Sequence, residues 1–171
     1  MFTLRELEKS DIYIINQWRN DAEVIECLGA PFRYINLDVD IKWFETYMNN
    51  RNSQIRCAVL SDGKVIGLVS LLSIDYLNQS AELHIMIGNK ENQNQGAGTF
   101  AIKTMLDHAF KNMNLQRIEL TVLENNQRAR HVYEKVGFVC EGVKRKAKFK
   151  AGEFVNMCVY ALLKEEYKCG E

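Results

Sequence analysis

A glycine-containing segment, Gln93-Asn94-Gln95-Gly96-Ala97-Gly98-Thr99, lies between two patterned stretches of this 171-residue chain. Before it, Leu83, Ile85 and Ile87 share one face of an expected strand over residues 80–87. After it, apolar residues recur at helical spacing, at Ile102, Met105, Leu106, Ala109 and Met113. A turn of this kind directs backbone N–H groups and the positive end of a helix dipole at one point. The segment therefore predicts a phosphate-binding strand–turn–helix unit.

The spacing within this turn narrows the class of phosphate ligand. No Lys-Ser or Lys-Thr follows the glycines, and G-x-G-x-x-G is absent, so nucleoside-triphosphate and dinucleotide loops are disfavoured. Gln93, Gly96 and Gly98 instead fit Gln/Arg-x-x-Gly-x-Gly/Ala. This pattern resembles the pyrophosphate loop of the GNAT N-acetyltransferases, which bind acetyl-CoA. The alternative is an ordinary strand-to-helix turn.

A second segment, residues 122–138, resembles the last motif of the same family. It ends in Tyr133-Glu134-Lys135-Val136-Gly137-Phe138. Asn125 or Asn126 suits a helix N-cap, and Gly137 suits the helix end. The buried stripe of this helix is expected at Ala129, Val132, Tyr133 and Val136. The resemblance covers residues 60–163 well and the first 60 loosely, with similarity to the ribosomal-protein N-terminal acetyltransferase branch.

Composition restricts the partners and the compartment. Lys plus Arg and Asp plus Glu number 22 each, so no overall field favours nucleic acid or a membrane. The length predicts one domain over residues 1–171, and the absence of a signal-peptide pattern at the N-terminus predicts a cytoplasmic location. Three histidines lack ligand spacing, so no metal is expected. Five scattered cysteines (Cys27, Cys57, Cys140, Cys158 and Cys169) predict thiols and no disulfide framework.

The order of expected elements predicts an α+β fold with a mixed sheet. Strands are expected at 2–7, 56–60, 64–72, 80–87, 117–123, 144–150 and 154–162, and helices from Ser10 or Asp11, over 38–50, from the glycine turn to 113, and from Asn126. The helix over 38–50 is expected to bury Ile41, Phe44 and Met48. The resemblance implies a mainly antiparallel sheet flanked by helices, with an acetyl-CoA cleft between two splayed strands.

The resemblance also assigns the contacts with the acetyl-CoA co-substrate. The pyrophosphate would meet backbone amides of Gln95, Gly96, Ala97, Gly98 and Thr99. Main-chain groups of Met86 and Ile87 would pair with the pantetheine arm, and Gln93 would brace the turn. Asn126 would contact the CoA arm, and Arg130 would reach a phosphate.

Two residues are expected to carry the chemistry. Tyr133 occupies the position of the general acid of the family, and a phenol remains protonated at neutral pH. Glu82 is the candidate base, and His84 shares its side of the strand. The alternatives are a core-packing role for Tyr133 and a solvated carboxylate for Glu82.

The sequence indicates the acceptor substrate less directly than it indicates the acetyl-CoA co-substrate. The N-terminal third resembles both the ribosomal-protein branch and its small-molecule relatives, through Trp18-Arg19-Asn20-Asp21 and Lys42-Trp43-Phe44-Glu45. Alternation of Lys144, Lys146, Lys148 and Lys150 predicts one cationic strand face. A face of this kind that borders the acceptor cleft favours an amino-sugar nucleotide over a polyamine, and the alternative is a solvated face. A small-molecule amine is thus the expected partner, with a homodimer also compatible. The alternatives are a protein N-terminal acetyltransferase and a non-catalytic acyl-CoA-binding module.

Overall fold

One seven-stranded sheet runs through the computed structural model, which describes residues 1–88, 90–93 and 95–168. The strand order is β1-β2-β3-β4-β5-β7-β6. The strands are β1 (Phe2–Glu6), β2 (Ile55–Ser61), β3 (Lys64–Asp75), β4 (Ser80–Ile87), β5 (Arg117–Leu123), β6 (Val139–Lys150) and β7 (Glu153–Leu163). The helices are η1 (Lys9–Asp11), α1 (Ile12–Arg19), α2 (Ala22–Glu26), α3 (Leu37–Asn49), η2 (Lys90–Asn92), α4 (Ala97–Asp107), the π-helical turn η3 (His108–Asn112) and α5 (Gln127–Val136).

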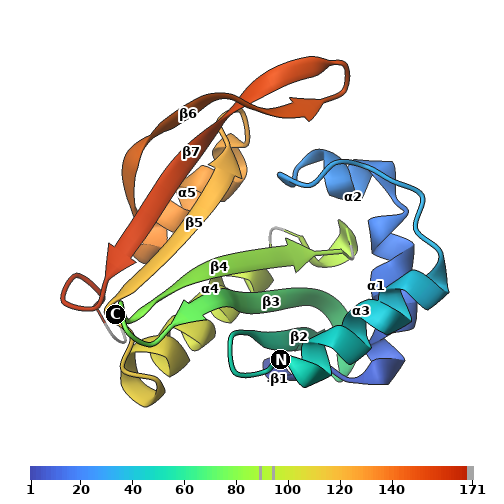
Figure 1. The fold of residues 1–171 in the computed structure, drawn as a ribbon, viewed down its shortest axis with the longest axis horizontal. Coiled ribbons are helices and arrows are strands. Elements are labelled where there is room, and N and C mark those ends of the chain that lie inside the picture. The colour runs from blue at the N-terminus through green and yellow to red at the C-terminus, as the bar shows by residue number, and fades with distance from the viewer. Residues whose placement is uncertain (89, 94, 169–171) are drawn as a thin grey trace.

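The sheet opens at its centre, between β4 and β5. All the other neighbouring strands in the sheet pair antiparallel, whereas β4 and β5 run parallel. Their pairing is short: it begins with Ser80 opposite Arg117 and ends with Glu82 opposite Glu119. Beyond Glu82, β4 continues along β3, and β5 continues along β7. Figure 1 shows the two strands diverging from this point. The expected mixed α+β sheet with splayed strands is therefore confirmed.

Helices cover the two faces of the sheet. The larger hydrophobic cluster joins Leu83 of β4 to Ile102 of α4 and Tyr133 of α5. The smaller cluster joins Trp18 of α1 to Phe44 of α3, with Met86 of β4 packed against it. Since β4 pairs with β3 without a break from Glu82 to Ile87, its side chains alternate between these two faces. Glu82, His84 and Met86 consequently share the α1/α3 face.

The helix boundaries expected from the sequence are close to those in the structure, with two local differences. Helix α1 follows the short helix η1, whose capping box joins Glu8 to Asp11, and Asp11 is itself buried against Arg5. In α3, Met48 is exposed and Tyr47 takes the buried position, because its hydroxyl donates to Glu6 of β1. The expectation that Met48 lies inward was therefore wrong.

The hairpin formed by β6 and β7 projects beyond the rest of the sheet (Figure 1). Its register shifts between Lys144 and Lys148, where three residues of β6 oppose one residue of β7. Within this bulge Lys146 has φ +50°, and its N–H donates to Oδ1 of Asn156. The expected continuous alternation of four lysines is therefore wrong, although Lys144, Lys148 and Lys150 still lie opposite Met157, Val155 and Glu153.

Candidate active site

The glycine turn supplies an open helix N-terminus. Gly96 is the N-cap of α4 at φ +87°, a conformation that glycine adopts without a steric cost, and its carbonyl accepts from the N–H of Phe100. A Cβ added at Gly96 would meet nothing within 4 Å, and one added at Gly98 would touch only Cδ1 of Ile85 at 4.0 Å. Ala97 is buried beneath the turn, whereas Thr99 is half-buried in the first turn of the helix. An anion can therefore approach the backbone closely here.

Two glutamine side chains hold this turn. Nε2 of Gln93 donates to the carbonyl of Ile87 at 3.1 Å, which links the turn to the end of β4. Oε1 of Gln93 accepts from Nη1 of Arg128 at 3.1 Å, which links it to the first turn of α5. Nε2 of Gln95 donates to the carbonyl of Glu91 at 2.8 Å. Arg128 thus brings a positive charge to the turn, a role that the sequence pattern did not indicate.

The unpaired edge of β4 leads from this turn into the opening between β4 and β5. Pairing with β5 ends at Glu82, so the edge from Leu83 to Ile87 faces the gap. An extended ligand arm can add to such an edge as another strand would. Met86 and Ile87 lie on this edge, and the Ile87 carbonyl is already occupied by Gln93.

Tyr133 lies nine-tenths buried in α5. Its ring packs edge-on against Phe138 at 5.9 Å and contacts Tyr160 at 6.4 Å, both between ring centroids. Its hydroxyl has no hydrogen-bond partner among the described residues, and none of their fully buried side-chain nitrogens and oxygens lacks one. The hydroxyl must therefore keep some exposure. Burial raises the pKa of Tyr133 to about 12, so the phenol holds its proton at neutral pH.

Glu82 and His84 form a pair at the point where β4 and β5 part. Nε2 of His84 lies 3.3 Å from Oε2 of Glu82, and each side chain is about half exposed. Glu82 pairs in register with Leu72 of β3 and with Glu119 of β5. The sheet therefore separates this carboxylate, on the α1/α3 face, from the buried Tyr133 on the other face.

Asn126 and Arg130 are engaged within the protein. Oδ1 of Asn126 caps α5 by accepting from the N–H of Ala129, and Nδ2 donates to the carbonyl of Cys27 at 3.0 Å. Arg130 donates from Nε to the hydroxyl of Tyr160 and from Nη1 to the carbonyl of Glu124, at 3.1 Å each. Arg130 thus links α5 to β7 and to the residue that follows β5, and Arg128 is the arginine that contacts the glycine turn.

The segment after α2 is fastened to the hairpin by a lysine. Nζ of Lys150 donates to three carbonyls, those of Ile25, Leu28 and Ala30, at 2.8 Å each. A Cβ at Gly29 would lie 3.1 Å from Cε of Met157, so this segment also packs closely on β7. Together with the bond from Asn126 to Cys27, these contacts connect residues 25–30 to α5, β6 and β7, which lie across the gap between β4 and β5. Figure 1 shows α2 lying opposite the hairpin.

Replacing Lys150 by methionine is expected to lower the free energy of unfolding by about 1–3 kcal/mol, because three carbonyls lose one charged donor. Urea denaturation measures the change. Lys148→Met is the matched control, since Lys148 lies on the same strand and its side chain has no partner among the described residues. Equal stability of the two variants would show that the Lys150 contacts do not hold the segment.

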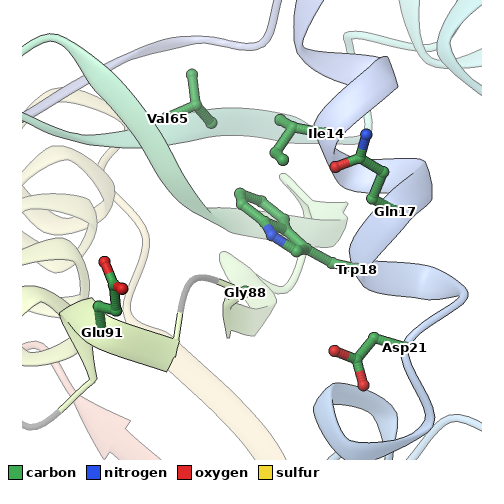
Figure 2. A pocket seen from close by; sticks show the side chains of 7 residues that line it. All are labelled: Ile14, Gln17, Trp18, Asp21, Val65, Gly88 and Glu91. Atoms are coloured by element: carbon green, nitrogen blue, oxygen red, sulfur yellow. The ribbon is translucent and has the colours of Figure 1, made fainter.

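A pocket of about 450 Å³ lies where α1 meets the ends of β3 and β4. Figure 2 shows Trp18 projecting from α1 into its centre, with Gly88 beneath the indole. A Cβ at Gly88 would lie 2.0 Å from Cδ2 of Trp18, so any other residue would displace the indole. Trp18, which is 7% exposed, therefore forms one wall of this pocket and belongs to the core between α1 and the sheet.

Several classes of site are not seen in the described residues. Among residues 1–88, 90–93 and 95–168, no cluster of His, Cys, Asp and Glu could hold a metal ion. The four described cysteines, Cys27, Cys57, Cys140 and Cys158, are free thiols, and Cys169 lies outside the described residues. Of the helices that the structure describes, none combines the length and the hydropathy needed to cross a membrane.

Comparisons with known proteins agree with this geometry. A family model described as an acetyltransferase (GNAT) domain matches residues 2–139. The spermidine N(1)-acetyltransferase of Escherichia coli (strain K12) is 32% identical over 162 residues, 92% of this chain and 84% of that protein. A putative ribosomal N-acetyltransferase of Bacillus subtilis (strain 168) is 32% identical over 114 residues, 67% of this chain and 62% of that protein. A crystal structure of spermidine N-acetyltransferase from Vibrio cholerae in complex with CoA and spermine superposes with a TM-score of 0.90, at 30% identity, covering 97% of both chains.

Proposed function

Since this chain belongs to the GNAT family and is an acetyl-CoA-dependent N-acetyltransferase, we propose that its acceptor is the primary amine of a small molecule. One observation carries the proposal. Tyr133 and Glu82 lie on opposite faces of the sheet, and Glu82 is the last residue of β4 that pairs with β5. A donor entering the gap from one side can therefore meet an amine that approaches from the other.

Each residue has a distinct task in this proposal. Acetyl-CoA supplies a thioester carbonyl that the amine attacks and a thiolate that leaves. Glu82, directly or through water, accepts the proton that the amine loses as the new C–N bond forms. Tyr133 gives its phenolic proton to the departing sulfur, and its raised pKa keeps that proton available at neutral pH. The turn residues from Gln95 to Thr99 hold the CoA pyrophosphate through the backbone.

The arrangement favours a small molecule over a protein N-terminus. A peptide needs a groove that stays open at both ends, whereas residues 25–30 are tied across the opening by Lys150 and Asn126. The ribosomal alternative retains support from the likeness to the putative ribosomal N-acetyltransferase. We also infer that the enzyme works in the cytoplasm as one domain, and the exposed β6 edge is compatible with a homodimer.

Two relatives named above are spermidine acetyltransferases, and the charge near the opening of this chain bears on whether it shares their acceptor. Residues 27–36 contain no Asp or Glu and include Arg33. Lys144 and Lys148 are exposed on the hairpin next to this segment. A polyamine has less favourable electrostatics here than an amine bearing a phosphate. We therefore rank phosphate-bearing amines, amino-sugar nucleotides among them, ahead of polyamines as acceptors.

Replacing Glu82 by glutamine is expected to lower kcat/KM for the amine by about 10-fold or more, because the amide cannot accept a proton. Release of CoA, measured with a thiol reagent, follows the reaction. His84→Gln is the matched variant, since it removes the neighbouring ionisable group and leaves the carboxylate in place. A loss confined to His84→Gln would transfer the role of base from Glu82 to His84.

A further inference from the structure

Arg56 is a half-buried arginine in an unusual setting. It lies on β2, opposite Ser70 of β3. Its Cζ atom is 4.7 Å from the ring centroid of Trp43 and 5.9 Å from that of Tyr47. Its Nε donates to Oε1 of Gln54 at 2.9 Å. The guanidinium therefore stacks against the aromatic side chains of α3, which fixes its plane.

The terminal nitrogens of Arg56 are not engaged. Neither donates to any described residue, and the described residues include no fully buried side-chain nitrogen without a partner. Both nitrogens must therefore keep some exposure to solvent.

Among the described residues, no carboxylate forms an ion pair with Arg56. Glu6 is bound by Arg51 and Tyr47, and Asp40 is bound by Arg19 and Asn16. Arg19 adds a second guanidinium 5.8 Å from the Trp43 ring. Burial lowers the pKa of Arg56, the neighbouring Tyr47 opposes this shift, and the nearby Arg19 adds to it.

The strand register aligns Arg56 with the candidate base. Arg56 lies directly opposite Ser70, and Ser70 lies directly opposite His84, so the three form one row across β2, β3 and β4. Neighbouring strands are about 4.8 Å apart, which places the backbones of Arg56 and His84 roughly 10 Å apart. Glu82 is on the same face of β4. This face thus offers an anion-binding group at one end and a carboxylate at the other.

We propose that Arg56, stacked on Trp43, binds an oxyanion of the acceptor whose amine is delivered to Glu82. The terminal N–H groups of a guanidinium match phosphate and carboxylate oxygens bidentately. This inference rests on the proposed function, because it assigns the two ends of the same acceptor. It predicts a substrate that is zwitterionic or anionic, unlike spermidine.

The test compares matched amines by calorimetry on protein saturated with CoA, so that the donor site is already occupied. Ethanolamine, phosphoethanolamine and β-alanine differ in having no anion, a phosphate or a carboxylate. Phosphoethanolamine is expected to bind the wild-type protein at least tenfold more tightly than ethanolamine, and β-alanine shows whether a carboxylate suffices.

Three variants test whether Arg56 causes the preference for phosphoethanolamine. Arg56→Gln is expected to bring phosphoethanolamine to the affinity of ethanolamine, and Arg56→Lys to retain part of the preference. Lys64→Gln, which removes an exposed cation at the start of β3, is expected to change nothing. Thermal unfolding and the affinity for CoA establish that each variant is folded.

The outcomes test the role of Arg56 and the proposed function separately. Equal binding of the three amines to the wild-type protein, tighter binding of spermidine, or a preference that survives in Arg56→Gln would overturn the assignment of Arg56. Failure to bind CoA, or failure to acetylate any small amine, would instead overturn the proposed function. Acetylation of small amines without a preference for an anion would leave the proposed function standing and remove the inference.

Discussion

Replacing Tyr133 by phenylalanine is expected to lower kcat by about 100-fold, the effect of losing a general acid from the chemical step. The dissociation constant for acetyl-CoA should stay unchanged, because the ring and its contacts with Phe138 and Tyr160 remain. The unfolding free energy should change little, since the hydroxyl has no hydrogen-bond partner among the residues described. Single-turnover kinetics measures the chemical step, titration calorimetry measures acetyl-CoA binding, and urea denaturation measures the unfolding free energy.

Tyr160→Phe is the matched control for this experiment. The hydroxyl of Tyr160 donates to Glu134 at 2.6 Å and accepts from Arg130, so its loss removes structural bonds. This variant should lose stability, by about 1 kcal/mol, and keep most of its turnover. If Tyr133→Phe kept the wild-type rate when chemistry limits turnover, Tyr133 would be a core residue and the proposed acid would be wrong.

Replacing Gly98 by valine is expected to weaken acetyl-CoA binding at least tenfold, which corresponds to about 1.4 kcal/mol. The helix itself tolerates a side chain here, because an added Cβ would lie 4.0 Å from Cδ1 of Ile85 and contact nothing closer. The branched methyl groups would instead occupy the space in which a phosphate approaches the N-terminus of α4. Titration calorimetry with acetyl-CoA measures the loss.

Gly98→Ala separates the two effects of a side chain at this position. Alanine adds one methyl group and reduces the freedom of the unfolded chain, so the variant should be as stable as the wild type or more stable. Because the motif accepts glycine or alanine here, acetyl-CoA affinity should stay near that of the wild type. Wild-type affinity in Gly98→Val would show that the phosphates bind elsewhere.

Local patterns predicted the central elements of the fold. Alternation placed β4 at residues 80–87 and β5 at 117–123, the bounds that the structure has. Of the two candidate caps for α5, the structure has Asn126, a choice that depends on the chemistry of a few adjacent residues. The divergence of β4 and β5 came from the family resemblance, since no local pattern encodes where two strands cease to pair.

Contacts between distant residues could not be predicted in this way. Lys150 meets carbonyls more than a hundred residues earlier in the chain, so strand alternation alone misplaced it on a continuous cationic face. Arg128 and Arg130 are two residues apart, and only the packing of α5 shows that Arg128 contacts the glycine turn. Arg56 belongs to an ordinary strand pattern, and its stacking on Trp43 depends on how α3 crosses the sheet.

Mass spectrometry of the reaction products tests the central claim most directly. The protein is incubated with acetyl-CoA and separate amines: phosphoethanolamine, glucosamine 6-phosphate, spermidine and a short peptide with a free N-terminus. We predict that a small amine gains one acetyl group, with one CoA released for each, and that Tyr133→Phe slows both by about 100-fold. Acetylation of the peptide alone, or bound acetyl-CoA with no acetylated amine, would contradict the assignment of this chain as a small-molecule N-acetyltransferase.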